Sequence, residues 1–178
     1  MKISILTLSI LLTCLAGFAQ STRKDITGDY FHLTGKVYEV DMFEGTEKSA
    51  VATQIIVYQE KELYVAFYTE KNGLYEFYLP TGFQYEIWYG GSSFVNKIVT
   101  VDSRMLPKSK KPSKLDLDIG LFRPVEGHEF PMLNEPYVQV IYDEEMASLI
   151  PDFEYTDEKS AQLEKIFRKL KKEMAKKS

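Results

Sequence analysis

The sequence predicts a mainly β protein: an antiparallel β-sandwich of about seven strands, followed by an extra C-terminal strand and one amphipathic C-terminal helix. Short runs rich in aromatic and β-branched residues alternate apolar and polar side chains, as strands with one buried face do. Turns that contain glycine or proline separate these runs. Residues 157–178 instead repeat apolar side chains at every third or fourth position, which is the period of a helix.

The stretch Thr69–Asp102 carries the strongest strand signal in the chain. Asn72-Gly73 predicts a tight turn, because both residue types tolerate a positive φ. Leu74–Leu79 and Phe83–Tyr89 then alternate cleanly, and Thr81-Gly82 between them predicts a second turn. We therefore expect these two runs to form neighbouring strands. The side chains predicted to face the core are Tyr75, Phe77, Leu79, Tyr85, Ile87 and Tyr89.

Other strands are expected from the same alternation and β propensity. Leu115–Phe122 alternates apolar side chains with aspartates and should complete the sandwich, which is expected to occupy residues 30–122. Residues 123–156 predict an irregular extension with one further strand, Pro136–Tyr142, that pairs with a sheet edge. The remaining expected strands are Tyr30–Val40, Val51–Gln59, Leu63–Thr69 and Phe94–Val101.

The final segment predicts an amphipathic basic helix over residues 157–178, with Thr156 as its cap. Such a helix is marginal alone in water and needs a surface to dock on. We favour its own sandwich as that surface, and a partner protein or an anionic membrane surface remain as alternatives. The apolar stripe that would make the contact comprises Leu163, Ile166, Phe167, Leu170 and Met174.

A sequence resemblance accompanies this pattern. The string T-x-K-N-G-x-Y-x-F-x-L-P-x-G-x-x-Y-x-I, from Thr69 to Ile87, resembles the carboxypeptidase regulatory-like domain, over roughly Leu33–Phe122. The resemblance implies a transthyretin-like, Ig-like β-sandwich of the kind common in exported proteins of Bacteroidota, where it is often attached to larger envelope proteins. It implies no catalytic residues. The chain departs from that domain at Thr46–Gln54, which lacks the P-L-x-G-A-x-V segment, and in its C-terminal extension.

The N-terminus predicts export. Lys2 precedes an apolar run, and Gly17-Phe18-Ala19 provides a small-x-small cleavage site, so residues 1–19 are expected to be a secretory signal peptide and residues 20–29 a flexible segment. Cys14 is the only cysteine. Lipidation at Cys14 would make the protein an outer-membrane lipoprotein, but Thr13 is a poor residue before such a cysteine, and we favour a cysteine inside a discarded signal. The expected location is the periplasm or the outer-membrane or cell surface.

The charge distribution argues against a nucleic-acid-binding protein. The whole chain has a formal net charge of −4, while residues 157–178 contain eight lysines and arginines against four acidic residues. The remaining body is therefore acidic, and nucleic-acid binding requires a basic face on the folded domain.

Residue patterns for catalysis or for metal and cofactor binding are not visible in the sequence. His32 is expected to be a half-exposed strand residue, and His128 next to Glu129 forms at most a weak metal pair without further ligand spacing. The acidic residues of Asp143–Glu145 and Asp152–Asp157 lack the glycine-bearing loop of an EF-hand, so they are expected to be a solvated face. We expect no enzyme, no cofactor and no metal site.

Aromatic side chains provide the one functional signal. Tyr78 and Trp88 are expected on the outward faces of neighbouring strands, where they would pair, and Tyr64 and Tyr68 would extend the patch. The alternative is that the C-terminal extension covers them. The leading hypothesis is an exported, non-enzymatic scaffold or accessory subunit that binds a larger envelope partner through this face or the helix. The second hypothesis is a carbohydrate- or peptidoglycan-binding module that uses Trp88 and Tyr78.

Overall fold

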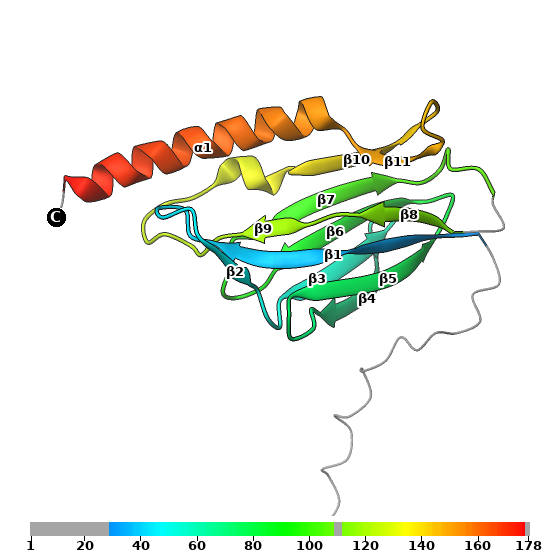
Figure 1. Cartoon of the computed structure of the whole chain (residues 1–178), viewed down its shortest axis with the longest axis horizontal. Coiled ribbons are helices and arrows are strands. Elements are labelled where there is room, and N and C mark those ends of the chain that lie inside the picture. The colour runs from blue at the N-terminus through cyan, green and yellow to red at the C-terminus, as the bar shows by residue number, and fades with distance from the viewer. Residues whose placement is uncertain (1–28, 109–111, 177–178) are drawn as a thin grey trace, which may run out of the picture.

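The computed structural model describes residues 29–108 and 112–176. The expected signal peptide, Cys14 and residues 20–28 lie outside this range. The described chain forms a mainly β sandwich with a C-terminal helix along one side, as predicted (Figure 1). The strands are β1 (Tyr30–Val40), β2 (Glu47–Ser49), β3 (Gln54–Gln59), β4 (Glu62–Tyr68), β5 (Leu74–Pro80), β6 (Gln84–Gly90), β7 (Lys97–Asp102), β8 (Ser113–Asp116), β9 (Ile119–Leu121), β10 (Val138–Asp143) and β11 (Ser148–Pro151), and the helices are η1 (Pro131–Asn134) and α1 (Phe153–Ala175).

The smaller sheet is built around β1. One side of β1 pairs antiparallel with β5 along its first half and with β2 at its end. The other side pairs in parallel with β8 and then β9. The expected single strand Leu115–Phe122 is therefore split in two, and β2 lies between the expected strands Tyr30–Val40 and Val51–Gln59, where no strand is predicted.

Gly35 of β1 lies against the Leu117 backbone at the point where the strand is split. Leu117 lies between β8 and β9, and its backbone oxygen accepts a hydrogen bond from the Tyr75 hydroxyl. A Cβ atom at Gly35 would lie 2.0 Å from that same oxygen. Glycine at position 35 therefore allows the chain between β8 and β9 to approach β1 closely.

The larger sheet has the order β11-β10-β7-β6-β3-β4. Its pairs are antiparallel, apart from the parallel pair of β10 with β7. The predicted strand Pro136–Tyr142 is confirmed as β10, and it does extend a sheet edge. The hairpin partner β11 falls in the acidic segment Asp143–Tyr155, for which no strand was predicted.

The prediction that Leu74–Leu79 and Phe83–Tyr89 are neighbouring strands is wrong. β5 pairs with β1 in the smaller sheet, whereas β6 pairs with β3 and β7 in the larger one. The Thr81-Gly82 turn therefore crosses between the two sheets, and Thr81 is bonded by its N–H to Asp29 of the segment before β1. Pro80, the last residue of β5, is paired with Tyr30 of β1 and not with β6.

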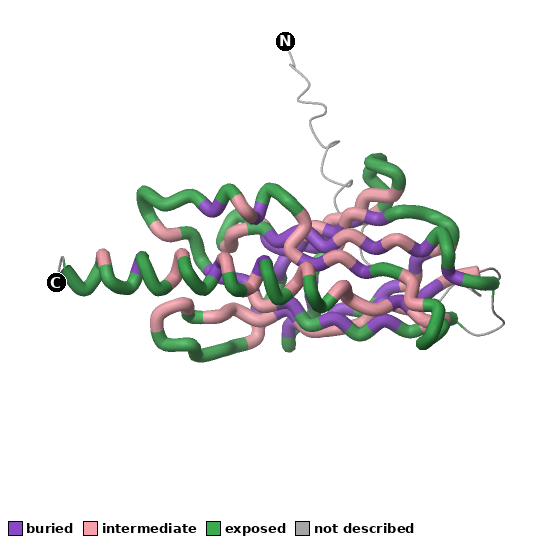
Figure 2. The backbone as a smooth tube through the Cα atoms, turned by 90° about the horizontal axis from the view of Figure 1, so that it is seen from above, coloured by how far each residue is buried: buried purple, intermediate pink, exposed green. Residues whose placement is uncertain are grey.

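The core between the sheets includes the side chains that the alternation predicted. All six predicted inward residues of β5 and β6 are at most 8% exposed. Apolar residues of β8, β9 and the Leu117 linker close the core from the β1 side. In Figure 2 the buried residues run through the strands at the centre of the molecule. The alternation therefore identified the inward faces correctly, although not the strand partners.

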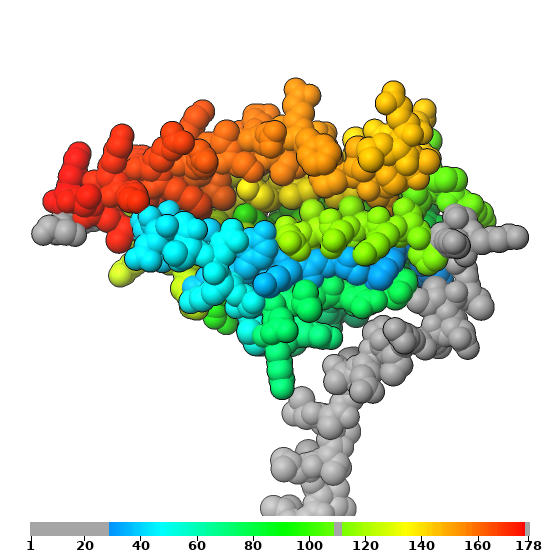
Figure 3. All heavy atoms as spheres, in the orientation of Figure 1, coloured from blue at the N-terminus to red at the C-terminus, as the bar shows by residue number. Residues whose placement is uncertain are grey.

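The helix α1 docks on its own chain, as we favoured. Its buried residues Leu163 and Leu170 pack with Phe122, Phe130 and Leu133 in a second apolar cluster. The Phe167 ring meets that of Phe122 edge-to-face at 4.9 Å. Figure 3 shows the helix as a layer on the sandwich, with the chain after β1 beneath its C-terminal half, where the Lys171 ammonium donates to the Phe43 carbonyl at 2.7 Å.

The predicted cap of α1 is wrong by four residues. Asp152 is the cap, and its carboxylate accepts a hydrogen bond from the Tyr155 N–H at 3.0 Å. Thr156 lies in the first turn, where its hydroxyl donates to the Asp152 carbonyl. Aspartate and threonine side chains can both accept the hydrogen bond from a backbone N–H at a helix cap, so the residue type alone does not distinguish the two positions.

Candidate interaction surface

An apolar patch covers the outer face of the larger sheet over β3, β4 and β6. The register places Ala66, Ile56 and Trp88 in one row across these strands, and Leu63 beside Tyr58 in the next. Leu63 and Tyr68 are 65% and 63% exposed, whereas the side chains on β3 and β6 are half-buried. We call this surface the sheet-face patch; it comprises Ile56, Tyr58, Leu63, Ala66, Tyr68 and Trp88.

Trp88 is held rigidly within the patch. Its indole N–H donates to the Glu86 carboxylate at 2.5 Å. Its ring meets the Tyr58 ring edge-to-face, with centroids 6.1 Å apart, an arrangement that aromatic pairs favour. Because the only polar atom of Trp88 is already bonded to Glu86, the surface that Trp88 offers is apolar ring.

The patch reaches a free sheet edge. β4 is the last strand of the larger sheet, so its far edge has no strand partner among the described residues. A bulge between Val57 and Tyr58 leaves Tyr64 unpaired in the register. β4 contains no proline and no lysine, the residues that commonly protect an edge from pairing with another chain.

A groove of about 590 Å³ adjoins the patch at Trp88. Its other lining residues come from β7 and the segment before it, and from the chain that leads into η1. We call it the Trp88 groove; its lining residues are Trp88, Val95, Asn96, Ile98, His128, Glu129, Phe130, Pro131, Leu133 and Asn134. The C-terminal extension therefore covers part of the outer face near Ile98, which is 5% exposed, but leaves the β3–β4 side open.

The predicted pair of Tyr78 with Trp88 does not exist. The two residues lie on different sheets, because β5 and β6 are not neighbours. Tyr78 instead stacks on His32, with ring centroids 4.3 Å apart, and the His32 Nε2 atom lies 3.0 Å from the Glu76 carboxylate. Tyr64 is 45% exposed, and its ring lies edge-to-face with the buried Tyr85 ring.

The predicted contact residues of α1 are largely used within the chain. Leu163 and Leu170 are 5% and 2% exposed, and Ile166 and Phe167 are half-buried against the same cluster. Met174 is 46% exposed. The stripe therefore forms an internal interface, and the sheet-face patch is the more accessible apolar surface.

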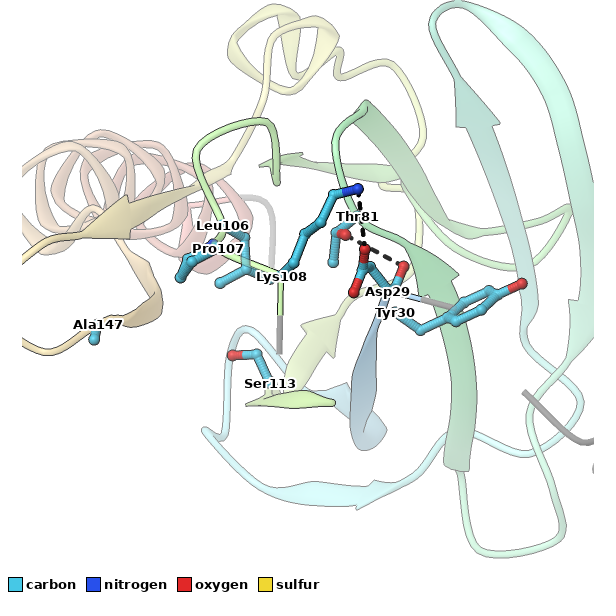
Figure 4. Close-up of a pocket in the computed structure, with 8 residues that line it drawn as sticks. All are labelled: Asp29, Tyr30, Thr81, Leu106, Pro107, Lys108, Ser113 and Ala147. Carbon is cyan, nitrogen blue, oxygen red and sulfur yellow. Dashed lines mark hydrogen bonds and ion pairs between the residues drawn. The ribbon is translucent and has the colours of Figure 1, made fainter. Parts of the chain in front are cut away.

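A smaller hollow of about 350 Å³ lies at the far end of the sandwich (Figure 4). Here the Lys108 ammonium lies 3.7 Å from the Asp29 carboxylate. The Thr81 hydroxyl donates to the Asp29 carbonyl at 3.2 Å. The charges in this hollow pair with one another, and its lining otherwise contributes hydroxyl and aliphatic groups.

Some charged groups near the surface form ion pairs across elements of the fold. Hydrogen bonds from Arg123 hold the pKa of the Glu39 carboxyl below its ordinary value, at distances of 2.8 and 3.1 Å. The His128 Nε2 atom lies 3.3 Å from the Glu173 carboxylate of α1. Among residues 29–108 and 112–176, no three histidine, cysteine or acidic side chains are grouped so that they could hold a metal ion.

No helix within the described ranges is long and apolar enough to cross a membrane. No family model and no curated protein matches the sequence, so the resemblance to the carboxypeptidase regulatory-like domain remains an expectation.

Some solved structures are similar to parts of this chain, at low identity and with TM-scores below 0.5. The catechol 1,2-dioxygenase of Pseudomonas arvilla is 10% identical with a TM-score of 0.41, over 58% of this chain and 56% of the enzyme. The minor pilin GBS52 of Streptococcus agalactiae is 12% identical with a TM-score of 0.41, over 58% of this chain and 48% of the pilin. A DUF3823 family protein from Parabacteroides merdae is 18% identical with a TM-score of 0.33, over 65% of this chain and 50% of that protein. The chain thus spans about half the length of these proteins.

Proposed function

We propose that this protein is a non-enzymatic accessory or scaffold subunit of the cell envelope, exported by its N-terminal signal, that binds a larger protein partner through the sheet-face patch. The observation that carries the proposal is the exposure of Leu63 and Tyr68 beside the rigid Tyr58–Trp88 pair. Apolar patches of this kind mark interaction sites, and tryptophan and tyrosine are enriched among the residues that dominate binding energy.

The position of the sheet-face patch supports a role in binding a partner, because its side chains are not needed to fill the core. The side chains of the patch point away from the sandwich core, which the inward residues of the same strands already fill. Burying Leu63 and Tyr68 against a partner would contribute roughly 1.5–3 kcal/mol for each side chain. Leu63 and Tyr68 both belong to β4, whose outer edge has no strand partner among the described residues. A partner segment in extended conformation can therefore pair with that edge while other parts of the partner cover the patch.

The test is capture of partners in the native host. A photoreactive residue at position 66, in the centre of the patch, should crosslink to one envelope protein, whereas the same residue at position 145, in the exposed β10–β11 turn, should not. The double variant Leu63→Ser/Tyr68→Ser should lose the crosslink. The matched control Met105→Ser/Met146→Ser also removes two exposed apolar side chains, which are 68% and 67% exposed, and should retain it.

Circular dichroism and thermal melting of each variant show whether the fold is kept. A crosslink that survives Leu63→Ser/Tyr68→Ser, or that forms equally from both positions, would overturn the assignment of the patch. Loss of capture only when Glu158–Ser178 is deleted, with the sandwich still folded, would return the contact to the helix.

A further inference from the structure

The Trp88 groove combines an apolar ring with neutral hydrogen-bonding groups. Ile98 and Phe130 lie beside Trp88 in its lining, and the amide side chains of Asn96 and Asn134 lie at its exposed positions. Its volume of about 590 Å³ is within the usual range for small-ligand sites, which is roughly 300–1,000 Å³.

The orientation of the Asn96 amide is set by a hydrogen bond. Its Oδ1 atom accepts from the Gly91 N–H at 3.0 Å. The NH₂ group of Asn96 is therefore the part that can donate to a ligand. Asn134 is the last residue of η1, lines the groove and is exposed. An amide both donates and accepts, which matches hydroxyl groups better than it matches charged groups.

The charges of the groove disfavour an anionic ligand. No lysine or arginine is found among the described residues that line it, and its one carboxylate is Glu129. The His128 side chain in the lining faces the Glu173 carboxylate. The whole chain also carries a net negative charge, which repels anions at long range.

We propose that the Trp88 groove binds a neutral sugar ring of a glycan chain, which stacks on Trp88 and is held by Asn96 and Asn134. A pyranose ring has an apolar face of C–H groups and a rim of hydroxyls, and the groove offers an aromatic surface and amides to match them. This site does not depend on the protein partner of the sheet-face patch, although Trp88 belongs to both surfaces. It also differs from a pair of Trp88 with Tyr78, which the two sheets keep apart.

The chain contains a single tryptophan, so its fluorescence reports directly on Trp88. The mature protein should be titrated with hexasaccharides of β-1,4-linked glucose, mannose and N-acetylglucosamine, and with a hexasaccharide of galacturonate as the anionic probe. At least one neutral hexasaccharide should give a saturable change in emission, and galacturonate should give none at the same concentration.

Two variants separate the groove from the patch. Asn134→Ala should weaken binding of the neutral hexasaccharide at least tenfold while partner capture is unchanged. Tyr68→Ala lies on the patch away from the groove and should leave the sugar affinity unchanged. Trp88 is intact in both, so the fluorescence of the unbound proteins also checks the fold.

The proposal is overturned if no neutral hexasaccharide gives a saturable response, if galacturonate binds equally well, or if Asn134→Ala binds sugar as the unaltered protein does. Loss of sugar binding in Tyr68→Ala would equally overturn it, because the site would then be the patch. Failure of partner capture with sugar binding retained would contradict the proposed function alone.

Discussion

The ammonium group of Lys97 lies 3.8 Å from the centre of the Tyr137 ring, inside the protein. Lys97 is 6% exposed, and burial lowers the pKa of its ammonium to about 7. The Tyr137 hydroxyl is in turn 2.9 Å from the Ser160 hydroxyl of α1. The contact of a cation with an aromatic ring thus lies where β7, the start of β10 and the helix meet.

Lys97 predicts a rise in stability above neutral pH. Its pKa is about 7 in the folded protein and close to 10.5 when unfolded, so between these values the unfolded chain binds more protons. The free energy of unfolding should therefore increase from pH 7 to pH 9 by roughly 2 kcal/mol. Well below pH 7, Lys97 is protonated in both states, so it should cause no further change with pH. Urea denaturation at the two pH values measures the change.

The variant Lys97→Met should remove that rise and increase stability at pH 7, because it replaces a buried cation by an apolar chain of similar length. Lys172→Met, at an exposed position of α1, should keep the rise of the unaltered protein. An unchanged pH dependence in Lys97→Met would show that another group is responsible.

Gly35→Ala should destabilise the sandwich. The added Cβ would lie 2.0 Å from the Leu117 backbone oxygen, so β1 and the β8–β9 linker must separate. We expect a loss of at least about 2 kcal/mol, at the upper part of the usual range for overpacking. Thermal or urea unfolding measures it. Gly45→Ala, where no atom lies within 4 Å, serves as the control and should cost only about 1 kcal/mol for its positive φ.

Leu170→Ala should loosen the helix from the sandwich. Leu170 is 2% exposed in the cluster with Phe122 and Phe130, so the change leaves a cavity and should cost about 2–5 kcal/mol. Hydrogen exchange should rise in α1 before it rises in the β-strands. Lys165→Ala, at an exposed position of the same helix, should alter neither, and equal effects of the two changes would argue against docking.

Asp152→Ala should lower the stability of the helix start by about 1 kcal/mol, because the Tyr155 N–H loses its acceptor. Asp157→Ala removes the same side chain inside the first turns of α1 and should cost only a few tenths of a kcal/mol. Urea denaturation measures the stability of both variants. An equal loss of stability would show that the negative charge near the helix start, and not the cap hydrogen bond, provides the stabilisation.

Part of the candidate surface was predictable from the sequence. The alternation in Phe83–Tyr89 correctly placed Trp88 on an outward face and Tyr85 in the core. The alternation in Leu74–Leu79 likewise placed Tyr78 outward, but the expected pairing of the two strands put it on the same sheet as Trp88, which is wrong. The error arose because a short turn after a proline suits a hairpin and a crossing between sheets equally well.

The Trp88 groove could not have been found by sequence patterns. Its lining joins Ile98 of β7, and Asn96 just before that strand, to Asn134 and Phe130, which belong to a segment with little periodicity. That segment is placed by Phe122 and Phe130 packing under the helix, at contacts between residues far apart in the chain. Signals for such contacts are absent from any local window of the sequence.

The sequence by itself determined the mainly β class, the inward face of each well-alternating strand and the amphipathic stripe of the final helix. These are properties of consecutive residues, because side chains alternate in a strand and recur every three to four positions in a helix. Only the tertiary structure decided that β5 and β6 belong to opposite sheets, that β8 and β9 run parallel to β1, and that the helix covers its own chain. Those choices depend on which apolar faces bury one another most completely, and that is settled by segments distant in sequence.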